Sequence, residues 1–341
     1  MTTTYDVAVV GATGAVGETM ISILEERKFP VGQLYPLASE RSTGKTISFR
    51  GTEIDVLPLS QHDFRKTPIG LFSAGGSISA EYAPKAASAG CVVIDNTAHF
   101  RFEADIPLVV PEVNPHKIAE YRNRGIIANP NCSTIQMLVA LKPIYDAVGI
   151  ERINVATYQA VSGTGKNAIE ELERQIRELL AFQTPTVEVY PKRIAFNVLP
   201  HIDVFQENGY TKEEMKMVWE TQKIMGDDRI LVNPTTVRVP VFYGHSEAVH
   251  IETREKITAE AARALLGKAP GIVVVDERKP GGYPTPMEAG GTDPVYVGRI
   301  REDISHPRGL NLWVVSDNVR KGAALNSIQI AELLIRDYLN S

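Results

Sequence analysis

The sequence is poor in cysteine and tryptophan and carries no excess of basic residues. Its 341 residues include only two cysteines, Cys91 and Cys132, so a disulfide framework is excluded. No His and Cys cluster has the spacing of a zinc site, and we expect no bound metal. The formal net charge of -5 provides no basic excess to recruit nucleic acid, so we expect no nucleic-acid partner.

Long apolar runs are also missing. No uninterrupted apolar segment is long enough to cross a bilayer, and the first residues do not form a charged and then apolar leader. We therefore expect no membrane association and a cytoplasmic location. The remaining composition, 43% hydrophobic and 23% charged residues, is that of an ordinary globular protein. A chain of this length exceeds the usual size of one compact core, which predicts two domains.

The first half alternates short apolar runs with helical patterns, which is typical of a parallel sheet with crossover helices. Strands are expected at residues 6–10, about 33–38, 69–72 and 91–94. The first strand leads into GATGAVG at residues 11–17, and the apolar spacing of a helix follows. Glycines here allow a tight turn and a close approach to a pyrophosphate at the helix N-terminus, which predicts a dinucleotide site. Its candidate residues are Gly11, Thr13, Gly14, Ala15 and Val16; a plain tight loop is the alternative.

The loop after the second strand bears on the choice of cofactor. Arg41 lies between Ser39 and Ser42, and an arginine among hydroxyls suits the 2′-phosphate of NADP. Glu40 leaves NAD open, since a carboxylate can bind the free ribose hydroxyls. We favour NADP. Ser73 and Gly75, in the small-residue loop after residues 69–72, are further candidates for contact with the cofactor.

One cysteine has the position of a nucleophile. Cys132, in NPNCST, follows an apolar run and begins a helical pattern. The helix N-terminus favours the thiolate, and its backbone amides with the Asn131 side chain offer donors for an oxyanion. The alternative is a small buried residue at a strand-to-helix corner. Cys91, inside CVVID, is expected in the core.

The second half has longer strands, expected at 153–160, 236–239 and 295–301, with helices near 168–180 and 213–225. This pattern predicts an α+β domain with a mixed or antiparallel sheet. A last helix at about 323–339 is expected to pack back on the first domain. We therefore divide the chain into a dinucleotide-binding domain, residues 1–131 and about 320–341, and a second domain, residues 132–319. The turn-rich stretch 279–294 is expected to be mobile or to contact a partner.

Six motifs together resemble the aspartate-semialdehyde dehydrogenase family. They are GATGAVG, NPNCST, YQAVSGTG, EEMK, RVPVFYGHSE and DNVRKGAA, and they occur in the family's order over nearly the whole chain. The resemblance implies an α/β enzyme with a Rossmann-like NADP-binding domain and a mixed-sheet catalytic and dimerisation domain. Members of the family are usually homodimers whose catalytic domains pair. The resemblance further implies NADPH-dependent conversion of L-aspartyl 4-phosphate to L-aspartate 4-semialdehyde and inorganic phosphate. This reaction serves the biosynthesis of lysine and diaminopimelate, threonine, methionine and isoleucine.

The resemblance also implies roles for individual residues. Cys132 matches the nucleophile that forms a thioester, and His245 matches the acid/base residue, for which a structural strand histidine is the alternative. Residues that match substrate-binding positions are Arg101, Asn131, Gln159, Glu213, Lys216 and Arg238. Ser162, Gly163 and Asn318 match positions near the nicotinamide. For Glu213 and Lys216, a solvated surface ion pair is the alternative.

Spacing adds two expectations about geometry. Glu213 and Lys216 are three residues apart, so both can point the same way from one helix. Arg238 and His245 are seven apart, which would place them on opposite faces of one regular strand, so a bend must bring both to one site. Pro240 cannot donate a ladder hydrogen bond, and we expect the strand to break there.

Two other functions remain open. N-acetyl-γ-glutamyl-phosphate reductase runs the same thioester chemistry on an acetylated substrate, but its cysteine usually follows a glycine, where Asn131 stands here. A non-catalytic paralogue would be expected to lose Cys132 or His245, and both are present.

Overall fold

The computed structural model describes residues 3–339, which form two compact units. Unit 1 contains the chain up to Pro130 and again from Ala323, and unit 2 contains Asn131–Gly322. Over the described range, no helix is both long and apolar enough to cross a membrane.

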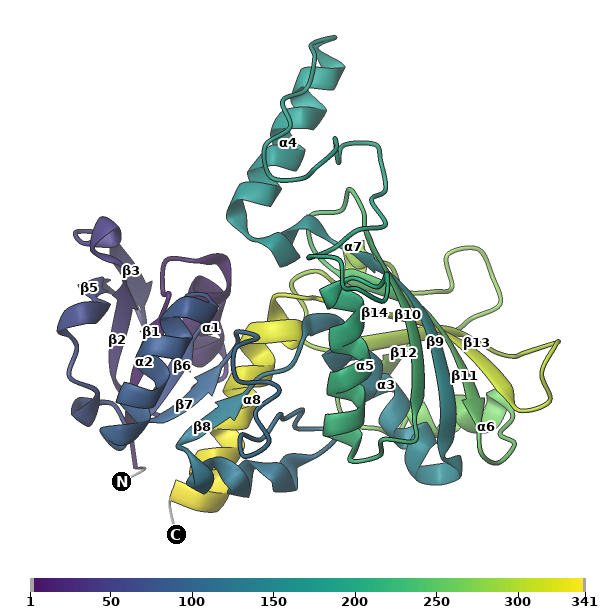
Figure 1. Ribbon diagram of the computed structural model, residues 1–341, viewed down its shortest axis with the longest axis horizontal. Coiled ribbons are helices and arrows are strands. Elements are labelled where there is room, and N and C mark those ends of the chain that lie inside the picture. Colours follow the sequence, from purple (N-terminus) through teal and green to yellow (C-terminus); the bar gives the residue numbers. More distant parts are fainter. Residues whose placement is uncertain (1–2, 340–341) are drawn as a thin grey trace. The chain divides into compact units, whose positions relative to one another are not determined.

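Unit 1 is built on a six-stranded sheet in the order β5-β2-β1-β6-β7-β8, in which every pair of neighbours is parallel (Figure 1). The strands are β1 Tyr5–Val10, β2 Val31–Ala38, β5 Leu57–Pro58, β6 Ile69–Phe72, β7 Val92–Asp95 and β8 Ile126–Ala128. A separate hairpin joins β3 Thr46–Phe49 to β4 Thr52–Asp55. The helices are α1 Ala15–Glu26 and α2 Gly76–Ser88, with short 3-10 turns at Glu40–Ser42, Leu59–Gln61, Phe64–Lys66 and Pro115–Asn123.

The C-terminal segment completes the core of unit 1. A π-helical turn, Arg320–Ala324, leads into α8 Leu325–Leu334, and a second π turn, Ile335–Leu339, follows. Leu325, Ile328 and Leu334 are buried in one cluster with Val7 and Val9 of β1. The expected helix at 323–339 and its return to the first domain are therefore confirmed.

Unit 2 is built on a mixed sheet in the order β10-β9-β11-β14-β13-β12. Its strands are β9 Ile150–Gln159, β10 Leu231–Arg238, β11 His245–Thr253, β12 Ile272–Val274, β13 Val295–Glu302 and β14 Gly309–Ser316. The pairs β9–β10 and β12–β13 are parallel, and the others are antiparallel. A parallel-sheet unit and a mixed-sheet unit confirm the predicted fold class.

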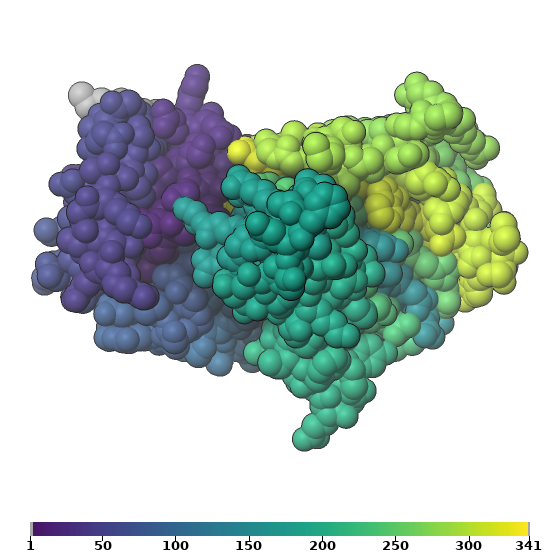
Figure 2. Space-filling model, turned by 90° about the horizontal axis from the view of Figure 1, so that it is seen from above, coloured from purple at the N-terminus to yellow at the C-terminus, as the bar shows by residue number. Residues whose placement is uncertain are grey.

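Five helices belong to unit 2: α3 Cys132–Val148, α4 Lys166–Leu180, α5 Lys212–Met225, α6 Ala259–Leu266 and α7 Pro286–Ala289. A 3-10 turn, Val161–Thr164, follows β9. Helix α3 packs on β11 and β14, and α5 packs on β10. Helix α4 extends away from the sheet of unit 2 in the ribbon view, and the teal residues around it form a lobe in the space-filling view (Figures 1 and 2). The turn-rich stretch 279–294 is irregular apart from α7.

The expected break between Arg238 and His245 is confirmed. β10 ends at Arg238 and β11 begins at His245, so the two residues lie on different strands. Residues 239–244, with Pro240, connect the two, and β9 lies between them in the sheet. The odd spacing therefore imposes no conflict of faces, since each residue takes its direction from a different strand.

Candidate active site

Cys132 is the first residue of α3 and is half-buried. Asn131 caps this helix, because its Oδ1 accepts hydrogen bonds from the Ser133 and Thr134 backbone amides at 3.0 and 3.3 Å. The thiol thus lies at a helix N-terminus, where the peptide dipoles favour negative charge. The expected oxyanion donors are partly wrong, since the cap already occupies the amides of Ser133 and Thr134.

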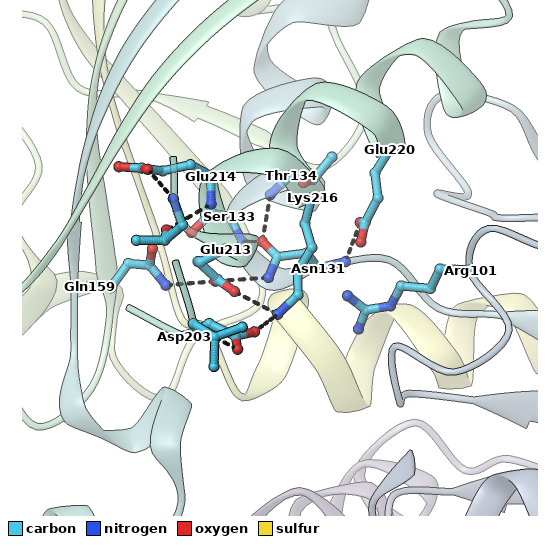
Figure 3. Close-up of polar contacts among 12 residues, drawn as sticks. Arg101, Asn131, Ser133, Thr134, Gln159, Asp203, Glu213, Glu214, Lys216 and Glu220 are labelled. Atoms are coloured by element: carbon cyan, nitrogen blue, oxygen red, sulfur yellow. Dashed lines mark hydrogen bonds and ion pairs between the residues drawn. The ribbon is translucent and has the colours of Figure 1, made fainter. Parts of the chain in front are cut away.

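The start of α3 is also tied to α5. The Asn131 Nδ2 donates to Glu213 Oε1 at 2.9 Å, and the Asn131 backbone amide donates to Glu220 Oε2 at 2.6 Å. Both carboxylates are buried. The position next to Cys132 is therefore fixed from its own helix and from α5 (Figure 3).

Four strands bring polar side chains into one transverse row. Arg238 of β10 pairs with Gln159 of β9, and His245 of β11 pairs with Ser316 of β14. The pairing of Ser246 with Tyr158 places His245 and Gln159 at the end of the same ladder. Arg238, Gln159, His245 and Ser316 are all buried on the same face of the sheet. We call them the polar row.

His245 is a fully buried, neutral imidazole. The Ala160 backbone amide donates to its Nδ1 at 3.0 Å, so the neutral ring carries its proton on Nε2. Nε2 has no hydrogen-bond partner among residues 3–339. Burial, with a contribution from the Arg238 guanidinium, lowers the pKa of His245 to about 3, although Glu213 opposes the shift.

Arg238 and His245 share a neighbour in Gly163. The Arg238 Nη1 donates to the Ala160 carbonyl at 2.7 Å, while its buried Nε finds no partner in the described part of the chain. A Cβ at Gly163 would lie 3.1 Å from Arg238 Nη1 and 3.3 Å from His245 Nε2. Glycine at this position therefore leaves both side chains their space.

Glu213 and Lys216 form a buried ion pair and not a solvated one. Lys216 Nζ lies 2.9 Å from Glu213 Oε2 and 2.8 Å from Asp203 Oδ2. Burial alone raises the pKa of Glu213, but Lys216 and hydrogen bonds from Asn131 and Gln159 outweigh it and hold that pKa at about 2. Burial lowers the pKa of Lys216, and its two carboxylates more than reverse this. Both side chains are therefore charged at neutral pH.

A single carboxylate oxygen joins the helix and the sheet. Glu213 Oε1 accepts from Asn131 Nδ2 and, at 3.1 Å, from Gln159 Nε2 (Figure 3). Asn131 precedes Cys132, and Gln159 belongs to the polar row. The shared oxygen therefore brings the candidate nucleophile and the polar row to the same place in unit 2.

Two more predicted residues of unit 2 meet each other. The Ser162 hydroxyl lies 3.1 and 2.9 Å from the two ends of the Asn318 amide. Asn318 Oδ1 also accepts from the Gly244 amide at 3.0 Å, one residue before His245. Ser162 and Asn318 thus border the loop that leads into β11.

A residue that the sequence prediction missed lies directly against the Cα and Cβ of Cys132. A Cβ at Gly322 would be 2.7 Å from the Cys132 Cβ, closer than real Cβ atoms approach. Gly322 belongs to the π-helical turn before α8 and to the motif DNVRKGAA, so the motif was a signal for it. Asp203 and Glu220 were missed as well, and nothing in their sequence context marks them.

In unit 1, the glycine turn has the geometry of a dinucleotide cradle. Gly11 has φ of 89°, and a Cβ there would lie 3.0 Å from the Ala74 backbone. A Cβ at Gly17 would lie 2.2 Å from the Gly11 carbonyl oxygen. Gly14 caps α1, whose first residues are Ala15 and Val16. The turn therefore leaves a helix N-terminus open to a phosphate group, and these residues fit the predicted cofactor.

The remaining predicted residues of unit 1 lie in the segments that follow β1, β2, β6 and β7. Thr13 Oγ1 lies 3.4 Å from Ser42 Oγ. Ser39 caps the 3-10 turn that holds Arg41, Ser73 donates to the Val10 carbonyl, and Gly75 caps α2 with φ of 99°. Arg41 and Glu40 are both exposed. Arg101 is buried in unit 1, where its Nη2 donates to the Asn96 carbonyl at 2.9 Å.

Among residues 3–339, no three His, Cys, Asp or Glu side chains converge on a point where a metal ion could bind.

Comparison with known proteins agrees with this geometry. Residues 6–121 match the family model for the NAD binding domain of semialdehyde dehydrogenase, and residues 141–321 match the model for its dimerisation domain. The aspartate-semialdehyde dehydrogenase of Legionella pneumophila is 66% identical over 98% of this chain and 96% of its own length. That of Shewanella violacea is 65% identical over 99% of this chain and 100% of its own.

Solved structures give the same result. The crystal structure of aspartate semialdehyde dehydrogenase II from Vibrio cholerae, complexed with ASA, has a TM-score of 0.97 and 62% identity over 99% of this chain and 100% of its own. The Candida albicans enzyme, solved with NADP, has a TM-score of 0.76 and 26% identity over 98% of this chain and 99% of its own. The chain belongs to the aspartate-semialdehyde dehydrogenase family of oxidoreductases.

Proposed function

We propose that this chain catalyses the NADPH-dependent reductive dephosphorylation of L-aspartyl 4-phosphate to L-aspartate 4-semialdehyde, through a thioester on Cys132. The observation that carries the proposal is the shared oxygen of Glu213, which holds Asn131, beside Cys132, and Gln159, in the polar row. A nucleophile at a helix N-terminus, a histidine and an arginine then converge on one place, as acyl transfer requires.

Cys132 and His245 perform the covalent step in this proposal. The Cys132 sulfur attacks C4 of the acyl phosphate, which forms the C–S bond and breaks the C–O bond to phosphate. His245 carries the thiol proton to the departing phosphate oxygen. The resting ring, with its proton on Nε2, is in the donor form. Uptake of a proton at Nε2 requires the other tautomer, in which the Ala160 amide loses its acceptor.

The charged side chains bind the substrate. Arg238 offers a planar guanidinium to the α-carboxylate, and Glu213 takes the substrate amine. Lys216 and Arg101 bind the phosphate, and Gln159 holds the acyl group near the sulfur. A free amine gives Glu213 a purpose that an acetamide would not, which favours the aspartyl substrate over N-acetyl-γ-glutamyl phosphate.

The cofactor is NADP in this proposal. When bound, NADPH supplies the hydride that reduces the thioester. Gly11, Thr13, Gly14, Ala15 and Val16 hold the pyrophosphate on α1. Ser39, Arg41 and Ser42 bind the 2′-phosphate; Ser73 and Gly75 line the cofactor in unit 1. Ser162, Gly163 and Asn318 approach the nicotinamide.

We also propose which part of the chain carries each function. Residues 1–131 and about 320–341 bind the dinucleotide, and residues 132–319 carry catalysis and pair two copies in a homodimer. The name of the matching family model, a dimerisation domain, supports the pairing. The enzyme acts in the cytoplasm on small molecules and releases inorganic phosphate. It serves the synthesis of lysine, threonine, methionine and isoleucine.

The first test is the reverse reaction, followed by the appearance of NADPH from L-aspartate 4-semialdehyde, phosphate and NADP. We expect phosphate-dependent turnover that C132A abolishes and H245A lowers by roughly two to four orders of magnitude. NAD and N-acetylglutamate semialdehyde serve as controls. Turnover of the acetylated substrate alone would favour the reductase, and NADP binding without any turnover would favour a non-catalytic paralogue. An active C132A variant would exclude the thioester.

A further inference from the structure

Glu247 is a buried carboxyl group that the proposed reaction does not use. It lies two residues after His245 on β11, has no exposed surface, and points to the same face of the sheet as His245. Thr157 of β9 and Val314 of β14 flank it. Neither carboxyl oxygen has a hydrogen-bond partner among the described residues. Burying a charged carboxylate without hydrogen bonds would cost free energy, so the protonation state of Glu247 needs an explanation.

Gln136 is a second buried side chain with an unsatisfied polar atom. It lies four residues after Cys132 on α3, so the two share one helix face. Its Nε2 donates to the His245 carbonyl at 3.4 Å, and its side chain lies close enough to the Glu247 carboxyl to lower the pKa of that group. Its Oε1 is buried and has no donor in the described part of the chain. One proton on Glu247 would satisfy both this acceptor and one orphaned carboxyl oxygen.

We propose that Glu247 is a positioning residue that acts as a neutral carboxylic acid, donating its proton to Gln136 Oε1 and so holding α3 on β11. Gln136 then connects three groups: the helix face that carries Cys132, the backbone of His245, and the Glu247 side chain. This link sets the sulfur of Cys132 at a fixed place relative to the imidazole. It rests on the proposed roles of Cys132 and His245.

The charges around Glu247 agree with a neutral state. On its own strand it is flanked by His245, which is neutral, and by Val249. β9 and β14 present Thr157 and Val314, and α3 presents Gln136 with the thiol of Cys132 one turn earlier. Burial raises the pKa of Glu247 well above its ordinary value, and the Gln136 amide opposes this only in part. None of these elements brings a cation to Glu247 that would favour its charged form.

The first test uses stability and needs no activity. A carboxyl group that keeps its proton in the folded state binds more protons folded than unfolded, so stability falls as pH rises above about 4.5. Relative to E247Q, the wild-type folding equilibrium constant should fall by about tenfold per pH unit until Glu247 ionises. Urea unfolding from pH 5 to 8 at fixed protomer concentration measures this. Identical pH dependence in both proteins would overturn the proposal.

The second test measures positioning. E247L keeps the volume but cannot donate, and we expect its kcat to fall about tenfold or more with little change in KM. E247Q can still donate an N–H to Gln136 Oε1 and should restore kcat to within about threefold of wild type. The rate at which iodoacetamide alkylates Cys132 should follow kcat: E247L should differ clearly from wild type, and E247Q should stay close to it. Cys91 does not compete, because burial raises its pKa to about 12.

A packing control separates positioning from general damage. V249T alters a buried residue on the same face of β11 but leaves the Glu247–Gln136 pair intact. It should lower stability and leave kcat unchanged. Equal losses of kcat in E247L and E247Q, or a loss in V249T as large as in E247L, would contradict the role of the donated proton. If the proposed enzyme activity itself failed, the unfolding test would still decide the protonation state.

Discussion

At the scale of residues, the site consists of side chains whose charges are set by their neighbours. Glu213 keeps its charge because Lys216, Asn131 and Gln159 outweigh its burial. His245 is neutral because no neighbouring charge outweighs the effect of its burial. Arg238 is buried with its Nη1 on a carbonyl and its Nε without a partner in the described residues. A guanidinium held in this way is prepared to accept an anion.

Replacing Arg238 by lysine tests the carboxylate site. R238K keeps the charge but cannot offer two parallel N–H groups, so we expect KM for L-aspartate 4-semialdehyde to rise about tenfold or more. Steady-state kinetics of the reverse reaction measures this, and KM for NADP should not change. Unchanged KM for the semialdehyde would move the carboxylate site elsewhere.

The neutral state of His245 predicts how stability responds to acid. Its pKa is about 3 when folded and about 6.5 when unfolded, so the unfolded chain binds the extra proton between these values. The contribution of the neutral ring is fully present above pH 6.5 and is lost as pH falls toward 3. Relative to H245N, wild-type stability should decline by about 1.4 kcal/mol per pH unit in this window. Urea unfolding at pH 4 to 7 tests this, and parallel curves would show that His245 titrates normally.

At the scale of elements, the site forms where strand ends and helix starts meet. The ends of β9 and β10, the start of β11 and the start of α3 all contribute to it. The π-helical turn before α8 also contributes, because its residue Gly322 lies against Cys132. The φ of Gly322 is not positive, so this position requires space and not a special backbone conformation.

A methyl group at Gly322 should therefore displace the thiol. G322A is expected to lower kcat by about 10- to 100-fold, because a misplaced nucleophile loses its alignment, and to cost about 1–3 kcal/mol of stability. The matched control is G267A, after α6, where φ is -65° and a Cβ meets only the carbonyl of the preceding helical turn. Similar kinetics for both variants and wild type would show that α8 yields to the methyl group.

Sequence patterns predicted the elements with regular periodicity and missed those without it. The first strand, α4 and α5 were predicted to within a few residues, because their apolar spacing is regular. The break before β11 was expected at Pro240, but β11 itself was not predicted. β11 is also hard to recognise, because it buries His245 and Glu247 on its inner face. Partners distant in sequence, such as Asp203 for Lys216, depend on the tertiary fold.

At the scale of the whole molecule, unit 2 is inserted in unit 1. The chain leaves unit 1 after Pro130 and returns at Ala323. The returning segment is central, because Ala324, Leu325, Ile328, Leu334 and Ile335 all belong to the buried cluster of unit 1. Arg27 of α1 and Glu332 of α8 add a two-point ion pair at 2.7 and 2.8 Å.

Removing residues 323–341 should affect the two units differently. Without these side chains the core of unit 1 loses several large buried groups, each worth about 2–5 kcal/mol, which exceeds the usual stability of a domain. We expect limited proteolysis with mass spectrometry to find cleavage throughout residues 3–130, while fragments of unit 2 resist. Equal resistance of both units would show that the sheet of unit 1 is stable without α8.

The position of α8 also fixes an order of events during synthesis. The ribosome makes the residues of unit 1 up to Pro130 before unit 2, but the helix that closes their core is made after unit 2. All of unit 2 emerges in between and can fold while unit 1 still waits for its final piece. The glycine turn for the dinucleotide therefore becomes part of a finished domain only after α8 has been synthesised.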